Sequence, residues 1–177
     1  MNPHLDDPIL RENRRSELVR RLISHGVRTK VIAGLTGVTR NRQATLRRRL
    51  MVRDKSRRRG PTKSSLELFL GSPRARAEGA ALVSFFSLFD IPLARGDPSL
   101  PKHASLDFTE RLCETYEAYR ALIPSTEIEF EELVLLRRAL SSGDDLALAR
   151  CRTCKCLILV DRFEGSHRAC GQCEPES

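Results

Sequence analysis

Residues 106–123, LDFTERLCETYEAYRALI, carry the clearest fold signal in this 177-residue chain. Their apolar side chains recur at steps of four, four, three and four, which is the spacing of one face of a helix. That face comprises Phe108, Leu112, Tyr116, Tyr119 and Ile123. A stripe of this kind packs on a core while the charged residues between its members face water. The pattern therefore predicts an amphipathic helix, with Cys113 as a small core residue.

The flanking segments extend the helical pattern in both directions. Downstream, residues 128–140 form a second amphipathic stretch, which we expect Ser125 or Thr126 to cap and Gly143 to end. Upstream, residues 80–91 are apolar on nearly all sides and predict a buried helix. The sequence therefore predicts a mainly α fold built around a helical body.

The N-terminal third predicts three shorter helices after a loosely ordered start at residues 1–11. We expect these helices at about residues 12–25, 28–35 and 40–52. Gly37 lies between the second and the third, where a tight turn needs a residue that accepts a positive φ. Two short helices joined by such a turn have the proportions of a helix-turn-helix.

The third of these helices is rich in side chains that read the base edges of DNA. Arg pairs with guanine, and Asn or Gln pairs with adenine. We expect five residues on its exposed face to bind DNA: Arg40, Asn41, Gln43, Arg47 and Arg48. The alternative is an ordinary three-helix packing whose basic face is only solvated.

The net positive charge is confined to the N-terminal segment. Residues 1–59 contain 17 Lys and Arg against 5 Asp and Glu, whereas the rest of the chain is slightly acidic. Such a basic block suits a phosphate backbone. No apolar run approaches the ~18 residues of a membrane span, and the N-terminus lacks the pattern of a secretory signal. We therefore expect a soluble, cytoplasmic protein with nucleic acid, and no membrane, among its partners.

The C-terminal 27 residues carry five of the six cysteines. Two C-x2-C pairs separated by 15 residues fit the spacing of a structural zinc site, since each pair can present both sulfurs to one metal ion. The predicted ligands are Cys151, Cys154, Cys170 and Cys173. We expect one structural zinc per chain, with Cys156 and His167 as bystanders. Disulfides and an iron–sulfur cluster are the weaker alternatives.

These patterns divide the chain into three segments. Residues 1–59 form the basic, helix-turn-helix-like region, and residues 60–149 form a helical core that also binds a partner. Residues 150–177 form a small zinc-binding module with four cysteine ligands, in which residues 157–160 suit a short strand. A metal ion is needed because so short a segment buries too little surface to fold alone.

Two motifs in this arrangement resemble the FlhC family of bacterial flagellar transcriptional activators. They are ACGQCEP at residues 169–175, which follows the upstream C-x2-C pair, and LISHGVR at residues 22–28. The resemblance covers about residues 16–175 and is most specific in the cysteine tail. It implies that the four zinc ligands of the family correspond to Cys151, Cys154, Cys170 and Cys173.

The resemblance also implies partners. FlhC-type proteins act with FlhD, a small helical dimer, in a hetero-hexamer of two C and four D subunits. That complex binds promoter DNA, recruits σ70 RNA polymerase and activates flagellar operons. An FlhC-like activator of other operons, such as conjugation genes on mobile elements, remains an alternative.

Two further function classes remain open on the sequence alone. One is a nucleic-acid enzyme stabilised by zinc, and the other is a zinc-stabilised adaptor that makes no DNA contact. An enzyme would need clustered carboxylates or a His–carboxylate pair. The four histidines are scattered, and the adjacent Asp144 and Asp145 follow a glycine where a turn is expected. We therefore expect that the protein is not an enzyme.

Overall fold

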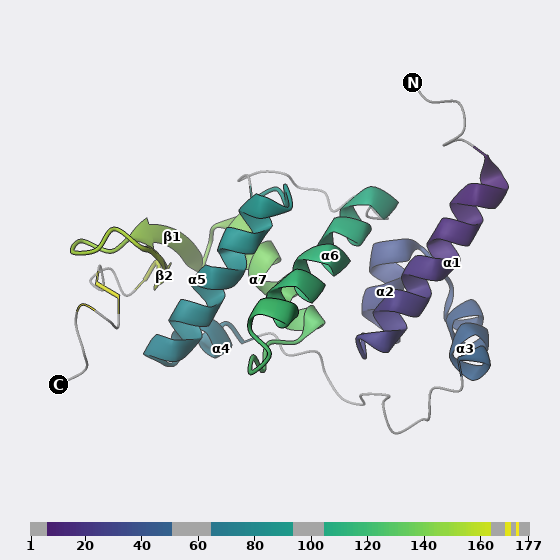
Figure 1. Cartoon of the computed structure of the whole chain (residues 1–177), viewed down its shortest axis with the longest axis horizontal. Helices are drawn as coiled ribbons and strands as arrows, with labels where there is room; N and C mark the ends of the chain where they lie inside the picture. Colours follow the sequence, from purple (N-terminus) through teal and green to yellow (C-terminus); the bar gives the residue numbers. More distant parts are fainter. Residues whose placement is uncertain (1–6, 51–64, 94–104, 164–168, 171–172, 174–177) are drawn as a thin grey trace. The chain divides into compact units, whose positions relative to one another are not determined.

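The computed structural model describes residues 7–50, 65–93, 105–163, 169–170 and 173. Over these residues the chain is mainly helical, with one small β-hairpin (Figure 1). It also carries a cluster of cysteines near the C-terminus. The predicted fold class is confirmed at this level. No helix in the described part of the chain has both the length and the apolar character needed to cross a membrane.

The chain divides into two compact units. The first contains residues 1–61 and 99–114, and the second contains residues 62–98 and 115–177. The cysteine-rich segment lies in the second unit. The division falls within a single helix, α6 (Leu106–Leu122), whose first half serves one unit and whose second half serves the other.

The first unit contains α1 (Pro8–Ser24), α2 (Thr29–Thr36) and α3 (Arg40–Arg49). Helix α1 begins four residues earlier than predicted, within the segment expected to be loosely ordered. Asp7 explains this start, because its carboxylate accepts a hydrogen bond from the backbone N–H of Ile9 at 2.8 Å. Pro8 occupies the first helical position, where its fixed φ favours the helix.

Aliphatic side chains from three helices form the core of this unit. Helix α1 contributes four of them, and the next two helices and their turn supply the rest: Leu18, Val19, Leu22, Ile23, Ile32, Leu35, Val38 and Leu46. The first half of α6 adds Phe108 and Leu112, and Cys113 is fully buried as predicted. The Thr109 hydroxyl donates to the Leu35 carbonyl at 3.0 Å, which joins α6 to α2.

The turn between α2 and α3 has the geometry that a glycine allows. Gly37 caps α2 with a φ of 71°, and its N–H donates to the Ala33 carbonyl. Helix α3 follows after two residues and ends at Arg49, close to the predicted limits. The predicted end at residues 51–52 lies outside the described residues. Helices α2 and α3 therefore form the expected helix–turn–helix pair.

The second unit contains α4 (Glu67–Leu70), α5 (Pro73–Leu88), α7 (Phe130–Ser142), β1 (Leu146–Arg150) and β2 (Leu157–Asp161). Helix α5 begins seven residues before the predicted start because the Ser72 hydroxyl caps the N–H of Ala75. Gly143, with a φ of 65°, ends α7 as predicted.

The predicted caps of α7 are wrong. Glu129 is the N-cap residue and forms a capping box with Glu132. The Glu129 side chain accepts from the backbone N–H of Glu132, and the Glu132 side chain accepts from the backbone N–H of Glu129. Helix α7 therefore begins two residues later than expected. The Thr126 hydroxyl instead accepts from the N–H of Ile128 at 3.2 Å, within the loop that leads to the helix.

The β-hairpin packs on α5 and carries the cysteines. Strands β1 and β2 are antiparallel, with Arg150 paired to Leu157 nearest the loop. Leu159 of β2 is 2% exposed and lies against Gly79 of α5. A Cβ at Gly79 would lie 2.4 Å from Leu159 Cδ1, so a larger residue there would force the Leu159 side chain to shift. Strand β2 was predicted, whereas β1 was not.

Candidate metal centre and basic helical face

The short loop between β1 and β2 carries three cysteines. The backbone N–H of Cys151 donates to the Cys156 carbonyl at 2.9 Å, and the N–H of Lys155 donates to the Cys151 carbonyl at 3.1 Å. Lys155 has a left-handed φ of 62°, which turns the chain back towards β2. The loop therefore carries Cys151, Cys154 and Cys156 around a single tight turn.

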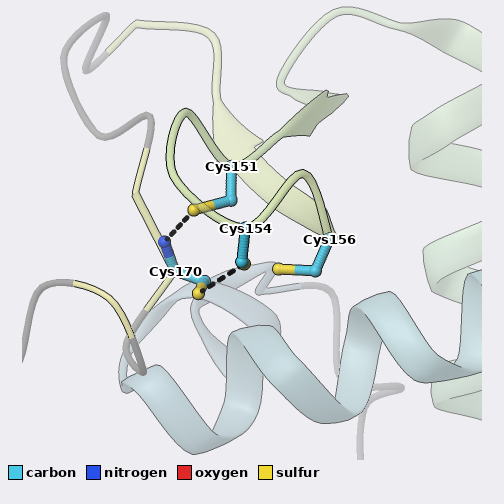
Figure 2. Close-up of side chains that lie close together, drawn as sticks. All are labelled: Cys151, Cys154, Cys156 and Cys170. Atoms are coloured by element: carbon cyan, nitrogen blue, oxygen red, sulfur yellow. Dashed lines mark hydrogen bonds between the residues drawn. The ribbon is translucent and has the colours of Figure 1, made fainter.

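Four sulfurs lie close enough to share one metal ion. The Sγ atoms of Cys151, Cys154, Cys156 and Cys170 all lie within 4.8 Å of one another (Figure 2). Sulfurs at 2.3 Å from a tetrahedral zinc ion stand about 3.8 Å apart. The Sγ atoms of Cys154 and Cys170 are 3.6 Å apart, which fits this geometry. The cysteine cluster can therefore hold a metal ion.

The fourth predicted ligand lies beside the cluster. The N–H of Cys173 donates to the Cys170 carbonyl at 2.9 Å. The four sulfurs that lie within 4.8 Å of one another are those of Cys151, Cys154, Cys156 and Cys170. Cys156, expected as a bystander, therefore occupies the place in this group that was predicted for Cys173. The other predicted bystander, His167, lies outside the described residues.

Backbone donors favour a thiolate at Cys151. The N–H groups of Cys154, Cys170 and Thr153 point at its sulfur and lower the pKa of the Cys151 thiol to about 5. The contact from the Cys170 N–H measures 3.4 Å and joins the two C-x2-C pairs (Figure 2). The side chain is fully buried, so these donors replace the water that would otherwise solvate the charge.

The neighbouring thiols keep their protons in the absence of a cation. The pKa of the Cys156 thiol is raised to about 12, first by a hydrogen bond to Cys154 and then by burial. The pKa of the Cys173 thiol is also raised to about 12, by hydrogen bonds to Cys154 and Cys170. Repulsion between neighbouring thiolates raises both pKa values further. A divalent cation removes this repulsion, so metal binding would release these protons.

Basic side chains lie along the same loop. Arg150 Nη1 donates to the Lys155 carbonyl at 3.2 Å, and Lys155 Nζ donates to the Arg152 carbonyl at 2.7 Å. A zinc ion held by four thiolates carries a net charge of about −2. These cations would partly offset that charge if zinc were bound.

The structure divides the five predicted DNA-binding residues of α3 into two groups. Arg40, Asn41 and Arg48 are exposed, as expected. The expectation for Gln43 is wrong, because it is fully buried and its amide donates to the carbonyls of Val38 at 2.8 Å and Thr29 at 3.2 Å. Helix α3 therefore packs on the unit through Gln43 and Leu46.

The buried side of α3 is rotated relative to the prediction. Gln43, expected on the exposed face, is buried, whereas the apolar Ala44 and Leu50 are exposed. Arg47 is half-buried, and its guanidinium donates to the Val27 carbonyl at 2.8 Å. This contact ties α3 to the segment that follows α1. Arg47 therefore has a structural role that the sequence analysis did not assign.

A cleft between α1 and α3 carries further basic residues. Its volume is about 700 Å³, and four arginines line it: Arg14, Arg20, Arg42 and Arg49. Several of these have carboxylate partners. Arg20 pairs with Glu17 at 2.8 Å, and Arg42 pairs with Glu12. Arg14 pairs with Asp107 and Glu110 of α6. The cleft could not be predicted from the pattern of α3 alone, because residues of both α1 and α3 line it.

Comparison with known proteins adds no relative: no family model matches the chain, and no curated protein is significantly similar to it. The resemblance to the FlhC family therefore stays a prediction based on the motifs quoted above. Two features of the molecule bear on its function, the cysteine cluster and the basic face of the first unit.

Proposed function

We propose that this protein is a DNA-binding transcriptional activator subunit of the FlhC type that contains a structural zinc ion. One observation carries the DNA-binding part of the proposal. The second helix of a helix–turn–helix pair exposes Arg40, Asn41 and Arg48 in the most basic segment of the chain. These side-chain types match the base edges of the major groove.

In this proposal α3 enters the major groove with its N-terminal end first. Asn41 pairs with adenine, and Arg40 pairs with guanine or a phosphate. Arg48, two turns further along the same face, contacts the phosphate backbone. Gln43 and Arg47 hold α3 in place from behind, so the reading residues are presented on a fixed helix.

The cleft arginines provide a second set of phosphate contacts. Arg42 and Arg49 of α3 face Arg20 of α1 across the cleft. A DNA strand that passes α3 therefore meets positive charge on this side of the helix as well. Each neutralised phosphate releases counterions, which makes the affinity depend on salt.

The metal centre has a structural role in this proposal. Cys151, Cys154, Cys170 and Cys173 would hold zinc through four thiolates, which leaves no open position for a substrate. The ion would supply folding energy by joining the hairpin loop to the second C-x2-C pair. An FlhD-like partner, σ70 RNA polymerase and flagellar target operons are supported by the family resemblance alone.

Selection and salt titration test the proposal. The full chain, with and without an FlhD-like partner, selects duplexes from a randomised pool, and anisotropy measures the affinity for enriched sequences. We expect log K to fall by about 0.9 per log unit of salt for each phosphate contacted. Reporter fusions to flagellar and conjugation promoters then distinguish the two classes of target.

A matched pair of variants locates the interface. The double variant Arg40→Ala/Arg48→Ala removes two cations from α3, and each lost contact should cost about 1–3 kcal/mol of binding free energy. Arg138→Ala, an exposed arginine of α7, is the control and should leave the affinity unchanged. No enriched sequence together with a flat salt response would identify the protein as an adaptor instead.

A further inference from the structure

The cysteine-rich segment offers one candidate thiol more than a tetrahedral metal ion can bind. The structure groups the sulfurs of Cys151, Cys154, Cys156 and Cys170, and the C-x2-C spacing predicts Cys173 as a ligand as well, whereas a structural zinc ion takes four ligands. Spacing alone made Cys156 the bystander, because the two C-x2-C pairs supply four ligands without it. The positions of the sulfurs do not support that distinction.

Cys156 is placed as a ligand would be. Its sulfur belongs to the group whose Sγ atoms all lie within 4.8 Å of one another, together with Cys151, Cys154 and Cys170 (Figure 2). Its backbone position is fixed on both sides. The left-handed turn at Lys155 precedes it, and the pairing of Leu157 with Arg150 follows it. The loop therefore holds this thiol at the cluster.

Cys173 approaches the cluster from the C-terminal side. Its backbone N–H donates to the Cys170 carbonyl at 2.9 Å, which places it next to one of the grouped cysteines, and its C-x2-C spacing from Cys170 is that of a zinc-binding pair. The two candidate sets of four therefore share three members, and they differ only in whether the fourth comes from the hairpin or from the C-terminal turn.

We propose that Cys156 and Cys173 are alternative fourth ligands of one metal ion, with Cys151, Cys154 and Cys170 as the shared three. This inference rests on the proposed metal centre and specifies its ligands. When the ligands exchange, one metal–sulfur bond forms as another breaks. The entering thiol gives up its proton and the leaving thiolate takes one, so charge and ligand number are unchanged.

Metal-binding measurements on the full chain test the proposal, with Co²⁺ and Zn²⁺ as probes. Cys156→Ser and Cys173→Ser should each bind one ion with a four-thiolate Co²⁺ spectrum, about twofold more weakly than wild type because one of two equivalent ligands is gone. The double variant should show a three-thiolate spectrum and bind at least about a hundredfold more weakly. Cys113→Ala, which removes the buried cysteine of α6, is the control and should bind as wild type.

A second measurement needs no substitution. Alkylation of the zinc-loaded wild-type chain should modify one thiol per molecule, divided between Cys156 and Cys173, while Cys113 stays unmodified because it is buried. Label confined to either residue would overturn the proposal. So would a single variant that binds metal as weakly as the double variant. A wild-type chain that binds neither ion would overturn the metal centre itself.

Discussion

Gln43 shows how a single buried polar side chain can determine the orientation of a helix. Its amide donates to two backbone carbonyls, at Val38 and Thr29, and the side chain has no exposed surface. Each carbonyl buried without a hydrogen-bond donor lowers the stability of the folded state by about 1–3 kcal/mol. The need to satisfy them explains why a glutamine occupies an inner position of α3.

A pair of amide substitutions distinguishes the inner and outer faces of α3. Gln43→Ala should lower the free energy of unfolding by about 1–3 kcal/mol, measured by urea denaturation, and leave the DNA affinity of the folded protein unchanged. Asn41→Ala, on the exposed face, should change stability by less than about 0.5 kcal/mol and weaken DNA binding. The reverse pattern would mean that the two faces have been exchanged.

Arg47 and Arg48 are neighbours with different expected roles. Arg47→Ala removes the hydrogen bond to the Val27 carbonyl and should destabilise the first unit by about 1 kcal/mol. Arg48→Ala should leave the thermal midpoint unchanged and weaken DNA binding. Thermal unfolding and anisotropy on the same samples check both expectations. Equal destabilisation by the two variants would contradict the assignment.

Burial could be predicted from the sequence where an apolar side chain lies in the core. The apolar stripe of α6 from Phe108 to Tyr119 and the buried Cys113 were placed correctly because apolar periodicity reports burial directly. Gln43 was misplaced because its polarity suggests exposure, whereas backbone carbonyls from two other segments decide its burial. No local pattern contains that information.

Among the elements, the hairpin depends on one close approach to α5. Leu159 and Phe69 both border Gly79, and a Cβ there would lie 3.3 Å from Phe69 Cδ1 as well as collide with Leu159. The cysteine loop joins the two strands of this hairpin. The packing of β2 on α5 therefore also positions the candidate metal ligands.

Gly79→Leu tests this dependence. The added side chain should overpack the contact and lower the free energy of unfolding by about 1–3 kcal/mol. Metal affinity should fall with it, because the loop loses its support. Gly34→Leu is the control, since nothing lies within 4 Å of a Cβ at that helical position. Unchanged metal affinity in Gly79→Leu would show that the loop keeps its shape without α5.

Helix existence was easier to predict than helix ends. The helices of the body were found from their periodicity, but α5 and α7 begin elsewhere because Ser72 and Glu129 act as caps. Strand β1 was missed for a different reason. A five-residue alternation is a weak signal, and β1 exists because the cysteine loop returns the chain to pair with it.

For the whole molecule, metal removal should act mainly on the second unit. That unit contains the cysteine cluster together with the hairpin, α5 and α7. A chelator should therefore increase backbone hydrogen exchange in the hairpin and leave α1–α3 protected, because those helices belong to the other unit. Uniform loss of protection would show that the two units unfold as one.

Metal retention should also depend on pH. The pKa values of Cys156 and Cys173 are raised to about 12, so binding the metal displaces protons from them at neutral pH. Acid adds competing protons, so the affinity should fall as the pH falls from about 8 to about 6. Competition with a chromogenic chelator measures this, and an affinity independent of pH would contradict thiol ligation.

The carboxylates beside the cleft have a consequence for selectivity. Glu12 and Glu17 already sit against Arg42 and Arg20, where a nucleic-acid phosphate would bind under the proposed function. Under that proposal, the two carboxylates occupy the places that phosphate oxygens would take. An incoming strand would have to displace them, which a long polyanion could do at several arginines at once and a small anion could not. The two ion pairs would therefore favour a polyanion over small anions at this cleft.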